Sequence, residues 1–248
     1  HSSAASDVYK RQGFVVPMPE QDNQDTTKVI IYGGNGFVGT QVAEALAGRA
    51  CVVCLSRSGH KPLHLKDEAW SEQVRWCKGD AADPDEKLLA TADVLVCLVG
   101  AAPLPTFSEQ AYEQAVHQNG ITNRNAIKAA ARVGIQRVIL LGAKIPWPMN
   151  NKYYAYAEGK RIAFSAAEDF AQGNPEHHAV VLQPGVIYGT RHRQDGRPIH
   201  LESVMKPVAK VLPGHFVAVE RLAERIAELA LTPPESLPNF HVITNRDI

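Results

Sequence analysis

The stretch Val29-Ile30-Ile31-Tyr32-Gly33-Gly34-Asn35-Gly36-Phe37-Val38-Gly39-Thr40 joins a short apolar run to a glycine-rich turn and the start of a helical pattern. The apolar run contains β-branched residues and predicts a strand that is buried on both faces. Gly33, Gly36 and Gly39 stand three residues apart, a spacing typical of a turn whose backbone lies against a pyrophosphate. A plain tight turn is the alternative, but the flanking strand and helix favour a dinucleotide site at a helix N-terminus.

Apolar runs alternate with amphipathic helical patterns along the whole chain. This alternation predicts an α/β fold of the Rossmann-like kind, a doubly wound parallel sheet with helices on both faces. Strands are expected at 28–32, 51–55, 74–78, 94–99, 137–141, 179–182, 215–217 and 240–243. Helices are expected at 36–47, from 84 onward, and at 108–133, 153–171, 202–211 and 220–231.

Length and composition suit one large α/β unit. The chain has 248 residues, of which 45% are hydrophobic, and its formal net charge is zero. Because there is no basic run, nucleic-acid binding by electrostatic attraction is not expected. No apolar stretch approaches the roughly 20 residues of a membrane-spanning helix. Cys51 and Cys54 lie three apart in an expected strand and so face opposite sides, which argues against a shared metal ion.

The chain divides into a polar tail and one domain. Residues 1–27 are polar and predict a tail without a core of its own. Residues 28–248 are expected to form a single NAD(P)-binding Rossmann-type domain, within which residues 190–218 form a reduced lid or docking region. The chain starts at His1 and not at methionine, so we expect it to be processed, truncated or incomplete.

The end of the second strand, Ser56-Arg57-Ser58, indicates which dinucleotide binds. It lies about 20 residues past the glycine turn, where this kind of fold contacts the ribose 2′ position. An acidic residue there favours NAD, whereas the Arg57 guanidinium suits a 2′-phosphate, so the sequence favours NADP(H) over NAD(H). A solvated turn arginine is the alternative. Asp80, after the third strand, would accept from the adenine amino group or would serve as a turn or cap residue.

Five motifs occur in an order that is found in one known superfamily. They are Gly33-x-x-Gly36-x-x-Gly39, Gly79-Asp80, Asn119-Gly120, Tyr156-x-x-x-Lys160 and Pro184-Gly185-x-x-Tyr188-Gly189. With them the chain resembles the short-chain dehydrogenase/reductase superfamily, in its extended and atypical branches. The stretches 33–39, 55–59 and 156–161 resemble one subgroup more closely. This subgroup contains the nucleotide-binding accessory subunit of mitochondrial respiratory complex I, the coenzyme Q biosynthesis relative in fungi, and plastid and mitochondrial relatives in plants.

The resemblance implies roles for individual residues. Tyr156 would donate or take a proton at a carbonyl or alcohol, unless the pair it forms with Lys160 is vestigial. Lys160, one helical turn further on, would lower the pKa of Tyr156 and hold the nicotinamide ribose. The residues expected to bind the cofactor are Gly33, Asn35, Gly36, Phe37, Val38, Gly39, Ser56, Arg57, Ser58, Asp80, Ala81, Val99, Gly100, Ala101, Asn119, Tyr156, Lys160, Pro184 and Val186.

The substrate half of the superfamily's site is eroded in this chain. Relatives carry a serine or threonine at the end of the fifth strand, whose hydroxyl polarises the substrate oxygen, and this chain has Gly142 there. Asn150 or Asn151 would supply an amide donor instead, or would cap the following helix. Gln183 stands where relatives often carry arginine. A dinucleotide held for structure explains this pattern better than turnover does.

The resemblance and the eroded site together favour an NADP(H)-binding, non-catalytic accessory subunit of a membrane-associated assembly, with respiratory complex I as the first choice. Its expected place is the matrix side of the mitochondrial inner membrane, or else a plastid. The alternative is an NADPH-dependent reductase or isomerase, linked to quinone metabolism, that uses Tyr156 and Lys160. Part of the segment Glu202 to Val219, with Arg191 to Arg197 beside it, is expected to contact another protein or the membrane surface. Closure of the nucleotide cleft by this segment is the alternative.

Overall fold

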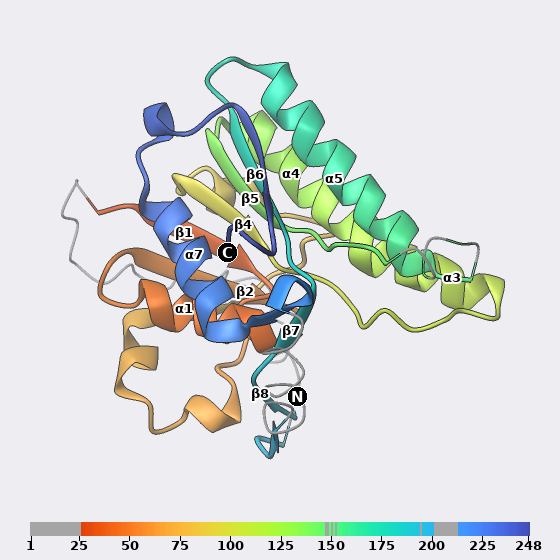
Figure 1. Cartoon of the computed structure of the whole chain (residues 1–248). Coiled ribbons are helices and arrows are strands. Elements are labelled where there is room, and N and C mark those ends of the chain that lie inside the picture. Colours follow the sequence, from red (N-terminus) through yellow and green to blue (C-terminus); the bar gives the residue numbers. More distant parts are fainter. Residues whose placement is uncertain (1–25, 147–148, 150, 152, 194, 201–212) are drawn as a thin grey trace, which may run out of the picture.

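Residues 26–146, 149, 151, 153–193, 195–200 and 213–248 are described by the computed structural model of the chain (Figure 1). The polar tail expected over residues 1–27 therefore lies outside the described residues except for its last two. The helix expected over 202–211 also lies outside them, together with most of the segment for which docking is expected.

One parallel sheet forms the centre of the fold. Its seven strands lie in the order β11-β6-β5-β4-β1-β2-β3, and all neighbouring strands are parallel. Because the order runs in both directions from β1, the sheet is doubly wound, and the predicted Rossmann-like α/β class is confirmed. The strands are β1 (Lys28–Tyr32), β2 (Cys51–Ser56), β3 (Val74–Lys78), β4 (Val94–Cys97), β5 (Arg137–Leu141), β6 (His178–Gln183) and β11 (Phe240–Thr244).

Helices cover both faces of this sheet (Figure 1). They are α1 (Phe37–Leu46), α2 (Glu86–Leu89), α3 (Glu109–Val116), α4 (Thr122–Val133), α5 (Ala155–Gly173) and α7 (Val219–Leu231). Side chains of α1 and α7 share one buried cluster with one face of the sheet, and side chains of α4 and α5 share a second cluster with the other face. α2 starts two residues later than expected, because Asp85 caps it by accepting from the N–H groups of Lys87 and Leu88.

Alternation along β1 divides its side chains between the two cores. Val29 and Ile31 belong to the cluster under α1 and α7, whereas Ile30 and Tyr32 belong to the cluster under α4 and α5. All four side chains are almost completely buried. The apolar run of β1 is therefore continuous because the strand has a hydrophobic core on each face, as the sequence predicts.

The long helix expected over 108–133 is interrupted by one wide turn. α3 is followed by the π-helical turn η3 (His117–Ile121), and α4 then continues to Val133. The N–H and the hydroxyl of Thr122 both donate to the carbonyl of His117, five residues earlier, which defines the wider turn. Such turns inside helices are frequent at functional sites.

Four short strands follow β6. β7 (Val186–Tyr188) pairs in parallel with β10 (Phe216–Ala218), and β8 (Thr190–His192) pairs in antiparallel fashion with β9 (Pro198–His200). Short 3-10 turns lie at η1 (Leu63–Leu65), η2 (Ala69–Gln73), η5 (Pro213–His215) and η6 (Pro234–Ser236). The described part of the region expected to form a lid, residues 190–218, contains the β8–β9 ribbon, η5 and β10.

The described residues contain no helix that is long and apolar enough to cross a membrane. Among the same residues, no three or more His, Cys, Asp or Glu side chains are grouped so that they could hold a metal ion. The four cysteines are free thiols, and burial raises the pKa of Cys97 to about 12. Cys54 and Cys97 therefore behave as small core residues.

A buried arginine ties the sheet to the last helix. Arg137 begins β5 and is only 5% exposed. Its Nη1 donates to the carbonyls of Leu229 and Ala230, at 3.3 and 2.6 Å, in the last turn of α7. These carbonyls have no partner within the helix and carry its partial negative charge, so the guanidinium stabilises the helix end.

We expect Arg137→Met to lower the free energy of unfolding by about 1–3 kcal/mol, because two buried carbonyls lose their donor. Urea denaturation followed by circular dichroism measures the change. Arg132→Met is the matched control, since Arg132 pairs with Glu86 and its side chain is 57% exposed, where an ion pair contributes about 0–1 kcal/mol. Equal losses in the two variants would show that Arg137 does not hold α7.

Candidate functional site

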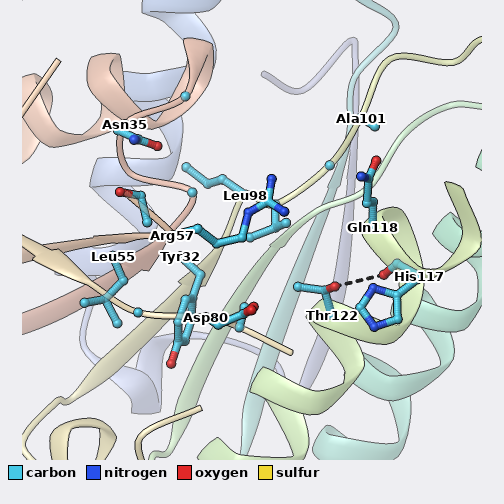
Figure 2. Close-up of a pocket in the computed structure, with 17 residues that line it drawn as sticks. Tyr32, Asn35, Leu55, Arg57, Asp80, Leu98, Ala101, His117, Gln118 and Thr122 are labelled. Atoms are coloured by element: carbon cyan, nitrogen blue, oxygen red, sulfur yellow. Dashed lines mark hydrogen bonds between the residues drawn. The ribbon is translucent and has the colours of Figure 1, made fainter. Parts of the chain in front are cut away.

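A cavity of about 410 Å³ opens at the carboxyl ends of the central strands (Figure 2). It lies beside β1, where the strand order reverses direction and where folds of this kind bind their ligands. Ten of the residues predicted to bind the cofactor line it, and so do seven others. The lining residues are Tyr32, Gly33, Asn35, Gly36, Leu55, Ser56, Arg57, Gly79, Asp80, Ala81, Leu98, Val99, Gly100, Ala101, His117, Gln118 and Thr122.

The glycines of the first turn have different roles. Gly33 has a φ of +86°, which other residues rarely adopt, and its N–H donates to the carbonyl of Leu55. Gly39 packs against the turn so closely that a Cβ would overlap the carbonyl oxygen of Gly33. Gly36 is exposed and lines the cavity. The turn is thus bent at Gly33, packed at Gly39 and open toward the cavity at Gly36.

Gly34 has a role that the sequence does not indicate. A Cβ on this buried residue would lie 2.5 Å from the Cβ of Cys54 in β2. The glycine turn therefore packs directly against β2, and a larger residue than Gly34 would push the turn away from the sheet. The three-residue spacing identifies Gly33, Gly36 and Gly39, but it does not predict that Gly34 packs against Cys54.

The N-terminus of α1 faces the cavity without a capping side chain. Gly36 is the N-cap, has no side chain to accept from the first N–H groups, and is followed by no acidic residue in the first turn. The first N–H groups of a helix carry partial positive charge and bind anions such as phosphate. This end of the cavity can therefore hold a pyrophosphate.

A network of hydroxyl and amide groups lies at the end of β2. The Nδ2 of Asn35 donates to the Oγ of Ser58 at 3.1 Å, and the hydroxyls of Ser56 and Ser58 lie 3.3 Å apart. The N–H of Gly59 donates to the Ser56 hydroxyl at 3.1 Å, which closes the turn. Arg57 is exposed between these serines and points into the space between the glycine turn and Gln118 in Figure 2. Among the residues just named, this corner is polar and cationic.

The floor beside this corner is formed partly by residues that the sequence analysis did not select. Tyr32 and Leu55 are the last buried side chains of β1 and β2, and both line the cavity. Their position at the carboxyl end of a strand is the signal that could have identified them. Asp80 also lines the cavity, but its Oδ1 accepts from the N–H of Ala82. This hydrogen bond is the one expected of a turn residue, and contact of Asp80 with the adenine stays a prediction.

The π-helical turn presents His117 and Gln118 to the cavity and turns Asn119 inward. Asn119 is fully buried, accepts from the N–H of Ala101 at 2.9 Å and donates to the carbonyl of Ala115. It therefore positions the loop that starts at Ala101 and does not itself line the cavity. His117 and Gln118 were not predicted from the sequence, because a regular α-helix without the π-helical turn would direct other side chains to the cavity.

The π-helical turn and α5 touch backbone to backbone. A Cβ on Gly120 would lie 2.7 Å from the carbonyl oxygen of Gly159, and a Cβ on Gly159 would lie 2.7 Å from the Cβ of Asn119. Two glycines are therefore needed at this crossing. The contact fixes where Lys160, the next residue of α5, meets the sheet.

Lys160 lies behind the cavity. It is 8% exposed, its Nζ donates to the carbonyl of Leu141 at 2.8 Å, and a Cβ on Gly100 would lie 3.7 Å from that Nζ. The Nζ lies 5.6 Å from the centre of the Tyr156 ring, so the expected pair does share a helix face. Burial lowers the pKa of Lys160 to about 8.

Tyr156 differs from the expected catalytic state. Burial raises the pKa of its hydroxyl to about 12, whereas the resemblance implies a pKa that Lys160 lowers. The physical reason is that the loss of hydration disfavours the phenolate. Tyr156 therefore stays protonated near neutral pH.

Gly142, which stands where relatives carry a hydroxyl, is tightly packed in the structure. Gly142 is buried, its N–H donates to the carbonyl of Leu182 at 2.8 Å, and a Cβ there would lie 3.0 Å from that same oxygen. Asn151 accepts from the N–H of Tyr153 and so serves as a cap before α5. Asn150 lies outside the described residues.

The other predicted cofactor residues lie around the cavity without lining it. Val38 and Gly39 are buried in α1, and Phe37 packs against the adjoining core. Pro184 is buried and its carbonyl accepts from the N–H of Lys144, whereas Val186 is 45% exposed on β7. Their roles remain predictions, as do those of Ser58, Asn119, Tyr156 and Lys160.

Comparison with known proteins agrees with this geometry. A family model described as the NAD dependent epimerase/dehydratase family matches residues 29–210. The chain belongs to that family. The match confirms the extended branch of the short-chain dehydrogenase/reductase superfamily, but it does not distinguish the complex I subgroup.

Two curated relatives are similar to the chain in sequence, and one solved structure is similar to it in fold. The chain is 30% identical over 225 residues to an uncharacterized chloroplastic protein of Arabidopsis thaliana, covering 86% of this chain and 68% of that protein. It is 38% identical over 78 residues to MIOREX complex component 2 of Saccharomyces cerevisiae, covering 29% of this chain and 28% of that protein. The Bordetella bronchiseptica enzyme WbmH, solved with NAD+, is similar in fold, with a TM-score of 0.60, 18% identity, and coverage of 87% of this chain and 75% of that one.

We expect Gly159→Ala to lower the free energy of unfolding by about 1–3 kcal/mol, because the new methyl group overpacks the crossing with the π-helical turn. It also moves Lys160 away from Leu141. Thermal unfolding measures the first effect. Gly173→Ala is the control on the same helix, since a Cβ there meets nothing within 4 Å. If Gly159→Ala is as stable as Gly173→Ala, the crossing does not set the position of α5.

Proposed function

We propose that this family member is an NADP(H)-binding protein with little or no turnover of its own, which serves as an accessory component of an organellar, membrane-associated assembly. The observation that carries the proposal is the contrast between the two halves of the site. In the nucleotide half, the glycine turn, the uncapped start of α1 and the polar end of β2 all border one cavity. In the substrate half, Gly142 stands where the superfamily carries a hydroxyl, and a Cβ there would be tightly packed, 3.0 Å from the carbonyl oxygen of Leu182.

The cavity fits a nicotinamide dinucleotide. Gly33, Gly36 and the uncapped start of α1 would hold the pyrophosphate, and Asp80 with Ala81 would lie at the adenine end. Gly100 and Ala101 would border the nicotinamide end, where the loop is held by Asn119. The dinucleotide would supply hydride chemistry, and the description of the family as NAD dependent supports this choice of cofactor.

NADP(H) is favoured over NAD(H) by the corner at the end of β2. Asn35, Ser56 and Ser58 provide donors there, and Arg57 adds a planar cation that can bind phosphate through two hydrogen bonds. Discrimination in favour of NAD relies on a carboxylate that accepts from the 2′-hydroxyl. No carboxylate follows β2 before Asp67 in the sequence.

Low turnover is the expected result of two features of the other half. Gly142 supplies no hydroxyl, and Lys160 directs one of its donors to the carbonyl of Leu141. A site that binds the cofactor in this way gains folded stability from it, because a ligand that binds only the native state stabilises that state. Retention of the nucleotide without catalysis is then a structural role.

The assembly and the compartment rest on the relatives and on the motif resemblance. One relative is named as a component of a complex and another is named chloroplastic, which supports an organellar protein that works within an assembly. Respiratory complex I on the matrix side of the inner membrane is the assembly that the subgroup motifs imply. A plastid is the alternative compartment.

A reductase or isomerase that acts on a quinone-like carbonyl is the second candidate. One observation favours it. Tyr156 and Lys160 are both present on one face of α5, and the Nζ of Lys160 lies close to Gly100. In that reading the hydroxyl of Tyr156 would donate to the carbonyl oxygen, and Lys160 would hold the ribose.

We expect Arg57→Ala to weaken NADPH binding by about ten- to a hundredfold, since a charge-assisted hydrogen bond contributes about 1.5–3 kcal/mol. NADH binding should be nearly unchanged, because NADH has no 2′-phosphate. Isothermal titration calorimetry on the full chain measures both. Arg49→Ala is the control, an exposed arginine that pairs with Glu224 away from the cavity. Equal losses for NADPH and NADH would mean that Arg57 does not contact the 2′-phosphate.

We expect the NADPH-loaded chain to oxidise its cofactor very slowly with carbonyl and quinone substrates, since the loss of one such donor costs about 10²–10³ in rate. Absorbance at the reduced nicotinamide band follows the reaction. Tyr156→Phe should leave the residual rate unchanged, as should Tyr153→Phe, a neighbouring exposed tyrosine. Rapid oxidation that disappears in Tyr156→Phe and persists in Tyr153→Phe would establish the reductase instead.

A further inference from the structure

A ribbon outside the nucleotide site gathers three arginines on one face. β8 and β9 form this ribbon at the periphery of the molecule, and Figure 1 shows β8 beyond β7, away from the central sheet. Arg191 lies opposite Ile199, and the N–H of Arg193 donates to the carbonyl of Arg197 at the next pair. Because side chains alternate along a strand and opposite partners share a face, Arg191, Arg193 and Arg197 lie on the same side.

The other side of the ribbon faces the body of the protein. The ring of His192 stacks on the ring of His64, with centroids 3.8 Å apart and planes 6° from parallel. A Cβ on Gly196, at the ribbon tip, would lie 3.4 Å from the Cβ of Leu63. Since His192 points inward, its neighbours Arg191 and Arg193 point outward, and all three arginines are exposed.

In the part of the chain that the structure describes, the arginine face carries a net positive charge. Arg193 and Arg197 are directly opposite, an arrangement that repels when both groups are cationic. Asp195 is the single acidic residue of the sequence from 190 to 200, and its carboxylate lies 3.7 Å from the Nε of Arg197. Burial and the neighbouring ring of His192 lower the pKa of His64, which disfavours a positive charge on that ring. An anion bound on this face would relieve the repulsion.

We propose that the arginine face of this ribbon binds the phosphate groups of anionic phospholipids. A protein partner would be expected to meet apolar or aromatic anchors as well as charges, and the one large apolar side chain on this face, Ile199, is partly buried. A lipid surface requires only exposed cations, because mobile anionic headgroups can arrange themselves around the cations.

This inference rests on the proposed membrane-associated role for its setting, but the nucleotide site takes no part in it. An experiment can therefore contradict phospholipid binding by the ribbon without contradicting the proposed NADP(H) binding, and the reverse is also true. A contact of three arginines is weak by itself, so it would orient the protein on a membrane to which its assembly already holds it.

Flotation of the full chain with vesicles tests the proposal. The vesicles contain equal parts of phosphatidylglycerol and phosphatidylcholine, or phosphatidylcholine alone, at low salt. Binding is expected only with phosphatidylglycerol and should fall as salt is raised, because screening weakens exposed charges. The variant R191Q/R193Q/R197Q should partition about a hundredfold less, at about fivefold for each arginine.

The control variant R132Q/R161Q/R221Q removes the same charge from exposed arginines elsewhere and should partition like the unmodified chain. Equal binding to neutral vesicles, or equal losses in the two triple variants, would overturn the proposal. So would a ribbon that binds single-stranded RNA or an acidic peptide in an arginine-dependent way while ignoring the vesicles. NADP(H) content is measured in parallel, and its loss in the ribbon variant would also overturn the proposal by placing the ribbon in the nucleotide site.

Discussion

The approach of Gly39 to the carbonyl oxygen of Gly33 is the contact on which the rest of the molecule depends. It brings α1 down onto the end of β1 so closely that no side chain fits between them. The helix N-terminus is then aimed at the cavity, and the apolar side of α1 meets α7 over one face of the sheet. The Arg137 guanidinium holds the far end of α7 to β5, so the glycine contact and the arginine contact together fix one complete layer.

The second layer depends on a similar contact between different elements. Gly120 and Gly159 let the π-helical turn touch α5, and this sets the depth of Lys160 beneath Gly100. At that depth the ammonium group meets a backbone carbonyl and loses most of its hydration, which lowers its pKa. The same burial raises the pKa of Tyr156. The two groups that would carry out proton transfer are thus moved by one packing arrangement toward their neutral forms.

Periodicity of the sequence was sufficient for the sheet, because buried parallel strands and amphipathic helices leave strong patterns. The runs at 28–32, 51–55 and 137–141 coincide with β1, most of β2 and β5. Finer features depended on geometry that periodicity does not carry. Nothing in the sequence around Asn119 indicates a wider turn, and so His117 and Gln118 were missed. The ribbon of β8 and β9 was likewise unrecognised, since its exposed faces are polar and its strands are only three residues long.

The central claim is that the cavity holds NADP(H) as a permanent part of the folded protein. Mass spectrometry of the nucleotide released from protein purified under native conditions, quantified against the chain, tests this most directly. The account predicts NADPH or NADP+ in nearly equimolar amount with the protein. Recovery of NAD(H) alone, or of no dinucleotide from the folded protein, would contradict it.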